Sequence, residues 1–289
     1  MADSDSISTP PAHSDALLVS FPAPKVLLLT LNRPKQLNAM SPALEADMYN
    51  VLRWFESEPG LWVVIVTGAG RAFCAGADLK AWNSDQGNAT RYQSEGIAAN
   101  IHGFGALSRR WTGSKPIIAA VNGLADVVGR ALGGGSEMVL NCDLVVASEK
   151  AAFGLPEVKR GVVAFQGGIP RLAKIAGHQL ASEMLLTGAT ISAADAATRY
   201  RFVNRVVPPA DVLPAALSLA AAIVANSPDA VQCTKRALMI AQGTGFEGAV
   251  QAHAWSEETR RVFQGENIQE GLRAFVEKRA PAWKNPAKL

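Results

Sequence analysis

The sequence predicts an α/β protein whose C-terminal part is entirely helical. Short apolar runs that suit buried strands alternate with helical or glycine-rich segments over the first two thirds of the chain. From about residue 182 onward the spacing of apolar residues is helical, with alanine-rich stretches. The 289 residues, 48 % hydrophobic and 18 % charged, are enough for one large domain or two small ones.

The first elements follow a polar N-terminus. Residues 1–16 are polar and contain Pro10-Pro11, which predicts a disordered tail. The apolar run at 25–31 predicts a buried strand, closed by Asn32-Arg33-Pro34. Ser41 is then expected to cap a helix that has Pro42 at its first position and apolar residues at helical spacing. A second buried strand is expected at 61–67.

The later elements follow from the same signals. Residues 83–100 are polar without a clear period, which is typical of a loop near a site. Two more strands are predicted at 116–121 and 144–146, and Ser192 is expected to cap a short helix over 193–199. Longer helices are predicted at 210–225, 229–242 and 266–278. The predicted regions are a tail at 1–16, an α/β core at 17–205, a helical region at 206–284 and a C-terminal tail at 285–289.

Charge and composition argue against several classes of protein. The 28 basic and 25 acidic residues leave a net charge of +3 without long basic tracts, so we expect no nucleic-acid partner. The three cysteines are far apart and the four histidines are isolated, which predicts reduced thiols and no metal site. The longest apolar stretch, 213–225, is too short for a bilayer, so we expect no membrane partner. GAGRAF at 68–73 lacks the third glycine of a dinucleotide fingerprint.

The stretch at 131–157 says most about function. The glycine triplet Gly133-Gly134-Gly135 stands just before Glu137, and Glu157 follows in the turn at 154–157. Glycines let a backbone approach a ligand and expose N–H groups at a helix start. Two converging carboxylates can share acid and base work on one water. The segment at 71–79 offers a second N–H donor, so these residues predict a site that stabilises an oxyanion and moves protons.

Seven segments of the chain follow one another in a recognisable order. They read LNRPKQLNAM (31–40), VVIVTGAGRAFCAGADL (63–79), KPIIAAVNG (115–123), LGGGSEMVLNCDLVVAS (132–148), FGLPEVKRGVV (153–163), GGIPRL (167–172) and EGLRAFVEKRAPAW (270–283). With them the chain resembles the enoyl-CoA hydratase/isomerase (crotonase) family over about residues 18–284. The run that begins GLPEVKRGVV, together with the ending Ala287-Lys288-Leu289, is most similar to fungal peroxisomal members.

This resemblance implies a fold and a reaction. The fold would be a crotonase-like spiral of repeated ββα turns, with a helical C-terminal region that forms a homotrimer or a dimer of trimers. The reaction would add water to a trans-2-enoyl-CoA thioester, giving a 3-hydroxyacyl-CoA. The backbone N–H groups of Ala77 and Gly134 would hold the thioester oxygen. Glu137 would activate the water, and Glu157 would protonate the α-carbon. No cofactor is implied, since coenzyme A is part of the substrate.

Other residues are candidates for binding the substrate. Lys35, Arg71, Lys80 and Lys278 could reach the phosphates of coenzyme A. The same motif segments place Ala75, Asp78, Leu79 and Gly133 beside the ligand, although Asp78 is expected to act structurally. The ring of Phe165, at a position where well-known hydratases often have glycine, would narrow the acyl pocket. The acyl chain length and the pathway, whether fatty-acid breakdown or specialised synthesis, stay open.

Two departures from the family pattern have structural consequences. Asn122-Gly123 is separated from Gly133 by nine residues rather than about three, and we assign the extra six to an insertion at 126–131. If this insertion bulges outward, Gly134 keeps its place; otherwise the oxyanion site moves, and a shift of about 1 Å can cost on the order of 100-fold in rate. Arg201 occupies a position where a helix-ending glycine is expected, so a positive φ is predicted there with about 1 kcal/mol of strain.

Location and alternative functions follow from these features. Ala287-Lys288-Leu289 differs from the peroxisomal Ser-Lys-Leu address by one small residue, which predicts a peroxisomal enzyme, with a cytoplasmic location as the alternative. One alternative function is double-bond isomerisation or another CoA-thioester reaction on the same scaffold. A second is a non-catalytic acyl-CoA-binding protein, in which the insertion at 126–131 has spoiled the oxyanion site.

Overall fold

Two sheets form the frame of the protein. The computed structural model describes residues 7–78, 96, 99–111, 113–123 and 129–287. Within them, one sheet has the strand order β1-β2-β3-β4-β6-β9 and the other the order β5-β7-β8. The strands of the first sheet, in that order, are Leu17–Ala23, Val26–Leu31, Val63–Gly68, Ile117–Val121, Leu144–Ser148 and Arg205–Val207. Those of the second are Gly129–Leu132, Ala151–Gly154 and Thr190–Ser192.

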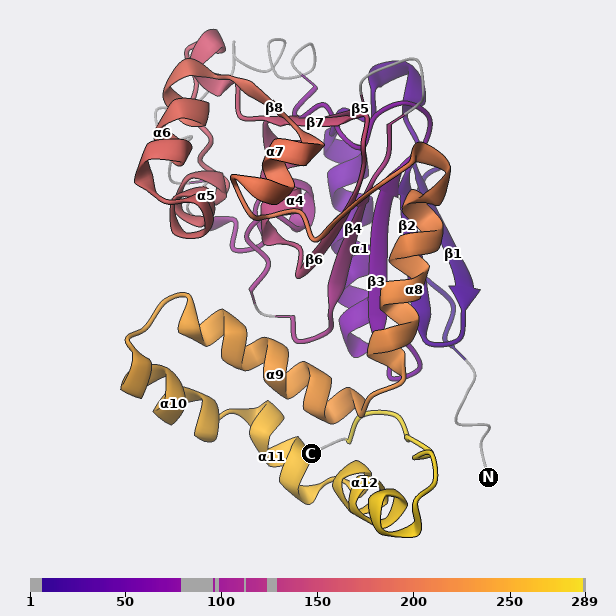
Figure 1. Cartoon of the computed structure of the whole chain (residues 1–289). Coiled ribbons are helices and arrows are strands. Elements are labelled where there is room, and N and C mark those ends of the chain that lie inside the picture. The colour runs from indigo at the N-terminus through magenta and orange to yellow at the C-terminus, as the bar shows by residue number, and fades with distance from the viewer. Residues whose placement is uncertain (1–6, 79–95, 97–98, 112, 124–128, 288–289) are drawn as a thin grey trace.

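The first sheet is buried on both faces. Its strands are parallel from β2 to β9, and β1 pairs antiparallel with β2 at the edge. Alternate residues of a strand point to opposite faces. Leu27 and Leu29 therefore join the larger core with side chains from α1 and α4, while Val26 and Leu28 pack against α8. Figure 1 shows α8 lying along one face of this sheet, with α1 and α4 behind it.

Helices surround this frame. In the described residues they are α1 (Pro42–Ser57), α4 (Gly134–Asn141), α5 (Gly168–Ala176), α6 (His178–Thr187), α7 (Ala193–Thr198), α8 (Val212–Val224), α9 (Pro228–Ala241), α10 (Phe246–Ala254), α11 (Glu257–Gln264) and α12 (Glu266–Glu277). Two predicted caps are confirmed. The Ser41 side chain accepts a hydrogen bond from the Leu44 N–H, and Ser192 accepts one from the Asp195 N–H.

The C-terminal helices form a separate layer. Figure 1 shows α9 to α12 together below the body that carries the sheets. Lys235 of α9 joins the two parts, because its buried ammonium donates to the Lys115 carbonyl at 2.7 Å and pairs with Asp143 at 2.9 Å. Among the described residues no single helix is long and apolar enough to cross a membrane; the segments Pro209–Val224 and Pro228–Ala241 meet that test only as a pair bent by 108°.

Several expectations from the sequence need correction. Residues 7–16 are not a disordered tail, because the Ser8 N–H donates to Glu58 at 3.0 Å and Ile7 packs on the core. Strand β1 and helices α10 and α11 were not predicted, nor was the helical region at 168–181. Most of the predicted loop at 83–100 lies outside the described residues.

Candidate active site

The glycine triplet lets the start of α4 pack closely against Phe104 and Cys74. Gly133 has a φ of 55°, and its N–H donates to the Gly154 carbonyl at 2.9 Å, which fixes the turn into α4. A Cβ at Gly134 would lie 2.5 Å from the ring of Phe104. A Cβ at Gly135 would collide with the Cys74 carbonyl oxygen. Because such contacts leave no room for a side chain, glycine is required at both positions.

The segment that contains Ala77 lies beside this helix start. Met40 pairs with Ala77 as in a parallel sheet, through bonds from the Met40 N–H to the Gly76 carbonyl and from the Asp78 N–H to the Met40 carbonyl. This pairing leaves the N–H of Ala77 on the side away from Met40. A Cβ at Gly76 would lie 3.6 Å from the nitrogen of Gly134, so the two segments are in close contact. Within the described part of the chain, neither the Ala77 nor the Gly134 N–H donates a hydrogen bond.

Glu137 is a buried carboxyl on the first turn of α4. Only 2 % of the residue is exposed, and its Oε1 accepts a hydrogen bond from the Gly168 N–H at 2.9 Å. Burial raises its pKa to about 7, although the Gly168 N–H favours the ionised form; the negative charge of Glu157 adds to the rise. A carboxyl that titrates near neutral pH can exchange protons during catalysis.

Glu157 lines the same cavity as Glu137. It begins the 3₁₀ turn Glu157–Arg160, directly after Pro156. Burial also raises its pKa, and its Oε2 is buried without a hydrogen-bond partner among the described residues. Its Oε1 would lie 3.0 Å from a Cβ at Gly133. Glu157 therefore lies at the glycine turn, and both carboxyls line the same cavity.

A cavity of about 800 Å³ joins these groups. Of the candidate residues, it is lined by Ala75, Ala77, Gly133, Gly134, Glu137, Glu157 and Phe165. Phe165 is 57 % exposed, so its ring lies at the wall of the cavity rather than in the core. A space of this size suits a small-molecule ligand.

The remaining candidate residues lie elsewhere. Lys35, Arg71 and Lys278 are exposed and outside the cavity lining, so their contact with coenzyme A phosphates stays a prediction. Asp78 pairs with Arg33 at 3.1 Å, which agrees with a structural role. Leu79 and Lys80 lie outside the described residues.

The sequence did not single out part of the lining. The additional residues are Gly76, Phe104, Leu132, Pro156, Lys159, Arg160, Gly161, Val162, Val163 and Gln166. Lys159 and Arg160 stand in the FGLPEVKRGVV segment, so their nearness to Glu157 was a signal available in the sequence. Phe104 and Gln166 reach the cavity only through the fold.

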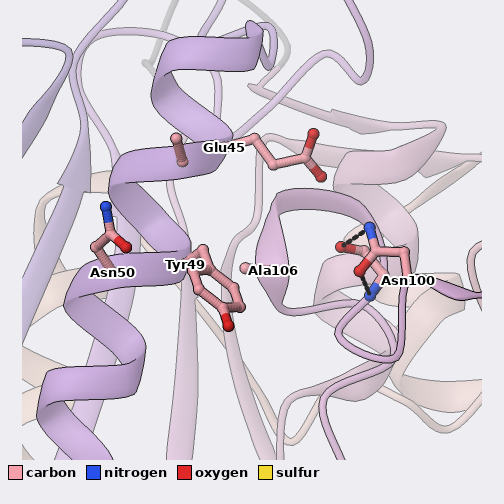
Figure 2. A pocket seen from close by; sticks show the side chains of 7 residues that line it. Glu45, Tyr49, Asn50, Asn100 and Ala106 are labelled. Atoms are coloured by element: carbon pink, nitrogen blue, oxygen red, sulfur yellow. Dashed lines mark hydrogen bonds between the residues drawn. The ribbon is translucent and has the colours of Figure 1, made fainter.

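A smaller cavity of about 210 Å³ lies between α1 and the segment at 100–106. Figure 2 shows Tyr49 of α1 next to Ala106, with Asn100 farther along the same segment. Glu45 accepts a hydrogen bond from the Gly105 N–H at 3.1 Å, and burial raises the pKa of Glu45. These contacts hold the segment that presses Phe104 against Gly134.

The extra residues before the glycine triplet leave the helix start in place. Gly129–Leu132 form β5, which pairs in parallel with Ala151–Gly154, so the second half of the predicted insertion at 126–131 belongs to a strand. A Cβ at Gly123 would lie 3.1 Å from the Gly129 nitrogen. Gly129 therefore lies next to Gly123, although five residues separate them in the sequence. Gly134 lies beside Gly76, where the oxyanion site was predicted. Residues 124–128 lie outside the described part.

The positive φ predicted for Arg201 is confirmed. Its φ is 61°, just after the end of α7.

Comparisons with known proteins agree with this geometry. The family model for enoyl-CoA hydratase/isomerase matches residues 23–286. A mevalonyl-coenzyme A hydratase of Aspergillus fumigatus is 48 % identical over 276 residues, covering 94 % of this chain and 96 % of that protein. A mevalonyl-coenzyme A hydratase of Beauveria bassiana is 44 % identical over 287 residues, covering 96 % and 97 %.

Solved structures of enoyl-CoA hydratases have a similar fold. A probable enoyl-CoA hydratase/isomerase from Mycobacterium abscessus superposes with a TM-score of 0.79 at 41 % identity, covering 93 % of this chain and 98 % of the other. The predicted crotonase-like fold is thus confirmed. The chain belongs to the enoyl-CoA hydratase/isomerase family.

Proposed function

We propose that this protein is a hydratase that adds water to, or removes it from, a CoA thioester, with Glu137 and Glu157 as its acid–base pair. The observation that carries the proposal is the convergence of these two carboxyls, and of the Ala77 and Gly134 N–H groups, on one cavity. Hydration needs both sets of groups. The carboxyls move protons, and the N–H groups stabilise the charge that develops on the thioester oxygen.

The proton balance of the reaction requires the pair to hold one proton. In hydration, Glu137 removes a proton from water, the oxygen bonds to the β-carbon, and the electrons of the double bond move onto the thioester as an enolate. Glu157 then delivers its proton to the α-carbon. The water supplies every atom that is gained, so the step uses no electron carrier. Two buried carboxyls with raised pKa values that repel each other's charge are suited to share one proton.

The roles of the two carboxyls follow from their hydrogen bonds. The Gly168 N–H at Oε1 of Glu137 favours the ionised form, which suits a base. Nothing in the described residues donates to Oε2 of Glu157, which suits a carboxyl that carries the proton. Burial opposes this assignment of base and acid, since it raises the pKa of Glu137 to about 7 and so favours its protonated form. A bound water that donates to Glu137 restores the preference for its ionised form.

The enolate oxygen would lie between the N–H groups of Ala77 and Gly134. Both donors are fixed by the backbone before the substrate arrives, so they need no reorganisation during the reaction. Loss of one such donor typically costs about 3–4 kcal/mol of transition-state stabilisation.

The substrate we propose is mevalonyl-CoA or a close analogue, because two relatives with 44–48 % identity over almost the whole chain carry that name. The mevalonyl group has one hydroxyl on its β-carbon and another at its end. Removal of the first with a proton of the α-carbon gives a conjugated enoyl thioester and water, which is the hydration reaction run backwards.

The test follows the absorbance of the conjugated enoyl thioester with mevalonyl-CoA and with crotonyl-CoA. We expect Glu137→Gln and Glu157→Gln each to lower kcat about 100- to 10,000-fold, the usual contribution of a general acid or base. Glu183→Gln is the control, because Glu183 is exposed and pairs with Arg199 at the surface. Turnover that survives in both active-site variants would refute the proposal.

The same variants separate the two alternatives from the hydratase. Double-bond isomerisation needs one carboxyl, so it predicts that Glu137→Gln loses hydration but still moves a double bond. A non-catalytic protein would bind the thioester without turnover by the native chain. No structural observation favours either, because Gly134 keeps its place beside Gly76.

We also propose that the C-terminal helices hold the subunits of a homotrimer, or of a dimer of trimers, together. Phe246, Trp255 and Phe275 are 86 %, 83 % and 85 % exposed. Large exposed apolar groups of this kind support an interaction surface. Light scattering would identify the oligomer, and a monomer at micromolar concentration would refute it.

A peroxisomal location is proposed from Ala287-Lys288-Leu289, of which only Ala287 is among the described residues. A fluorescent protein fused to the N-terminus should enter peroxisomes, and should stay in the cytoplasm when these three residues are removed.

A further inference from the structure

Gln166 occupies a fixed position at the wall of the catalytic cavity. It stands between Phe165 and the start of α5, and its carbonyl accepts a hydrogen bond from the Ser108 hydroxyl at 2.6 Å. Ser108 is fully buried, and its own carbonyl accepts from the Arg171 guanidinium at 2.8 Å. The Gln166 carbonyl is therefore held by Ser108, which is held in turn by Arg171.

The side chain of Gln166 carries an unused acceptor. Its Oε1 is buried and has no hydrogen-bond partner among the described residues. Gln166 lines the cavity together with both proposed catalytic carboxyls. A buried acceptor without a donor is destabilising, so such groups in native proteins usually have a reason. Rotation of the side chain toward the cavity would let Oε1 accept a hydrogen bond from a donor on a ligand.

The chemistry of the acyl chain limits which donor this can be. A plain alkyl chain and the thioester carbonyl offer no donor, and an ionised carboxylate only accepts. A hydroxyl donates to Oε1. The hydroxyl on the β-carbon is the one that the two carboxyls form or remove, so it belongs to them. Gln166 is then left for a second hydroxyl elsewhere on the chain.

We infer that Gln166 is a specificity-determining residue that accepts a hydrogen bond from a second hydroxyl of the acyl chain, beyond the carbons that react. The inference rests on the proposed hydratase function, because it needs the acyl group to lie between Gln166 and the two carboxyls. A site that hydrogen-bonds a substrate hydroxyl discriminates against the analogue that lacks it, because the protein acceptor is then left unpaired. From the usual cost of an unpaired buried acceptor we expect a preference of about 10- to 100-fold in kcat/KM.

The test compares two thioesters that differ by one hydroxyl. Mevalonyl-CoA and 3-hydroxy-3-methylpentanoyl-CoA have the same carbon skeleton, and only the first has a terminal hydroxyl. The ratio of their kcat/KM values for dehydration is measured for the native protein, Gln166→Leu and Gln179→Leu. Gln179 is an exposed residue of α6 and serves as the matched control. Because the readout is a ratio within one protein, partial loss of folded enzyme does not change it.

The expected result is a native ratio of about 10–100 that falls close to one in Gln166→Leu and is kept in Gln179→Leu. A native ratio near one overturns the inference without any variant. So does a high ratio that persists in Gln166→Leu. If the native protein hydrates crotonyl-CoA but dehydrates neither branched thioester, the inference fails while the hydratase function stands. If it turns over none of the three, the proposed function itself fails.

Discussion

Gly168 shows how the site depends on single residues. A Cβ at this position would lie 2.8 Å from Cγ of Glu137 and 3.1 Å from its Oε1, so the carboxyl occupies the space that a side chain would need. The same residue donates its N–H to that carboxyl. Gly168 therefore sets both the position and the ionisation of the proposed base.

Gly168→Ala should lower kcat about 10- to 100-fold, because it displaces the carboxyl from the reacting water. The backbone of Gly168 does not have a positive φ, so alanine fits the helix start and the protein should still fold. Gly243→Ala is the control, since only the Ile240 carbonyl lies near that site, at 3.9 Å. Hydration kinetics and circular dichroism check both variants. Unchanged kcat in Gly168→Ala would contradict the proposed role of Glu137.

The sequence singled out the polar groups of the candidate site, but it missed many of the residues that line the cavity. Glu137, Glu157, Ala77 and Gly134 follow from motifs in which a few neighbouring residues carry the signal. The unpaired oxygen of Gln166 is a property of three-dimensional packing, because its isolation depends on what surrounds the side chain in the folded state. No local pattern of residues could have revealed it.

At the scale of elements, the end of α7 carries strain. Arg201 has a φ of 61°, a conformation that costs a non-glycine residue about 1 kcal/mol or more. Arg201→Gly should therefore stabilise the protein by about 0.5–1 kcal/mol, after allowance for the greater freedom of glycine in the unfolded chain. Denaturant unfolding measures the difference. A decrease in stability would mean that the arginine side chain makes a contact worth more than the strain.

Local signals explain which elements could be predicted. Helices α1 and α7 each begin after a serine that accepts a hydrogen bond from the N–H three residues later. Because the cap and its partner are close in the sequence, the start of each helix could be predicted from local residues. Strand β1 is mostly exposed along its length and is defined by its pairing with β2. Helices α10 and α11 bury no residue fully within the chain. Because neither helix buries an apolar face within the chain, the spacing of apolar residues did not predict them.

At the scale of the whole molecule, the active site depends on long-range assembly. Ala77, Gly134 and Glu157 come from three separate segments, and the close contact between Gly76 and Gly134 links two of them. The seven motifs predicted the fold because they resemble a family in which this assembly is known. Composition and periodicity alone indicated an α/β core, but they did not show that the second sheet β5-β7-β8 would position the glycine turn.

The same assembly places the residues just before the glycine triplet in β5, a strand that was not predicted. The motif pattern fixed only the number of extra residues between Gly123 and Gly133. Gly129–Leu132 belong to the sheet because they pair with β7. The strand could not be predicted from local residues, because its partner lies far away in the sequence.

The pH dependence of kcat/KM tests the central claim, that the two carboxyls work while they share one proton. As pH rises through about 7, the upper pKa of the pair, the last proton is lost and no acid remains. As pH falls through the lower pKa, which is also raised, a second proton binds and no base remains. We expect a bell-shaped profile for the native enzyme, with its high-pH limb at about 7. A rate that stays constant between about pH 5 and 9 would contradict the shared-proton pair.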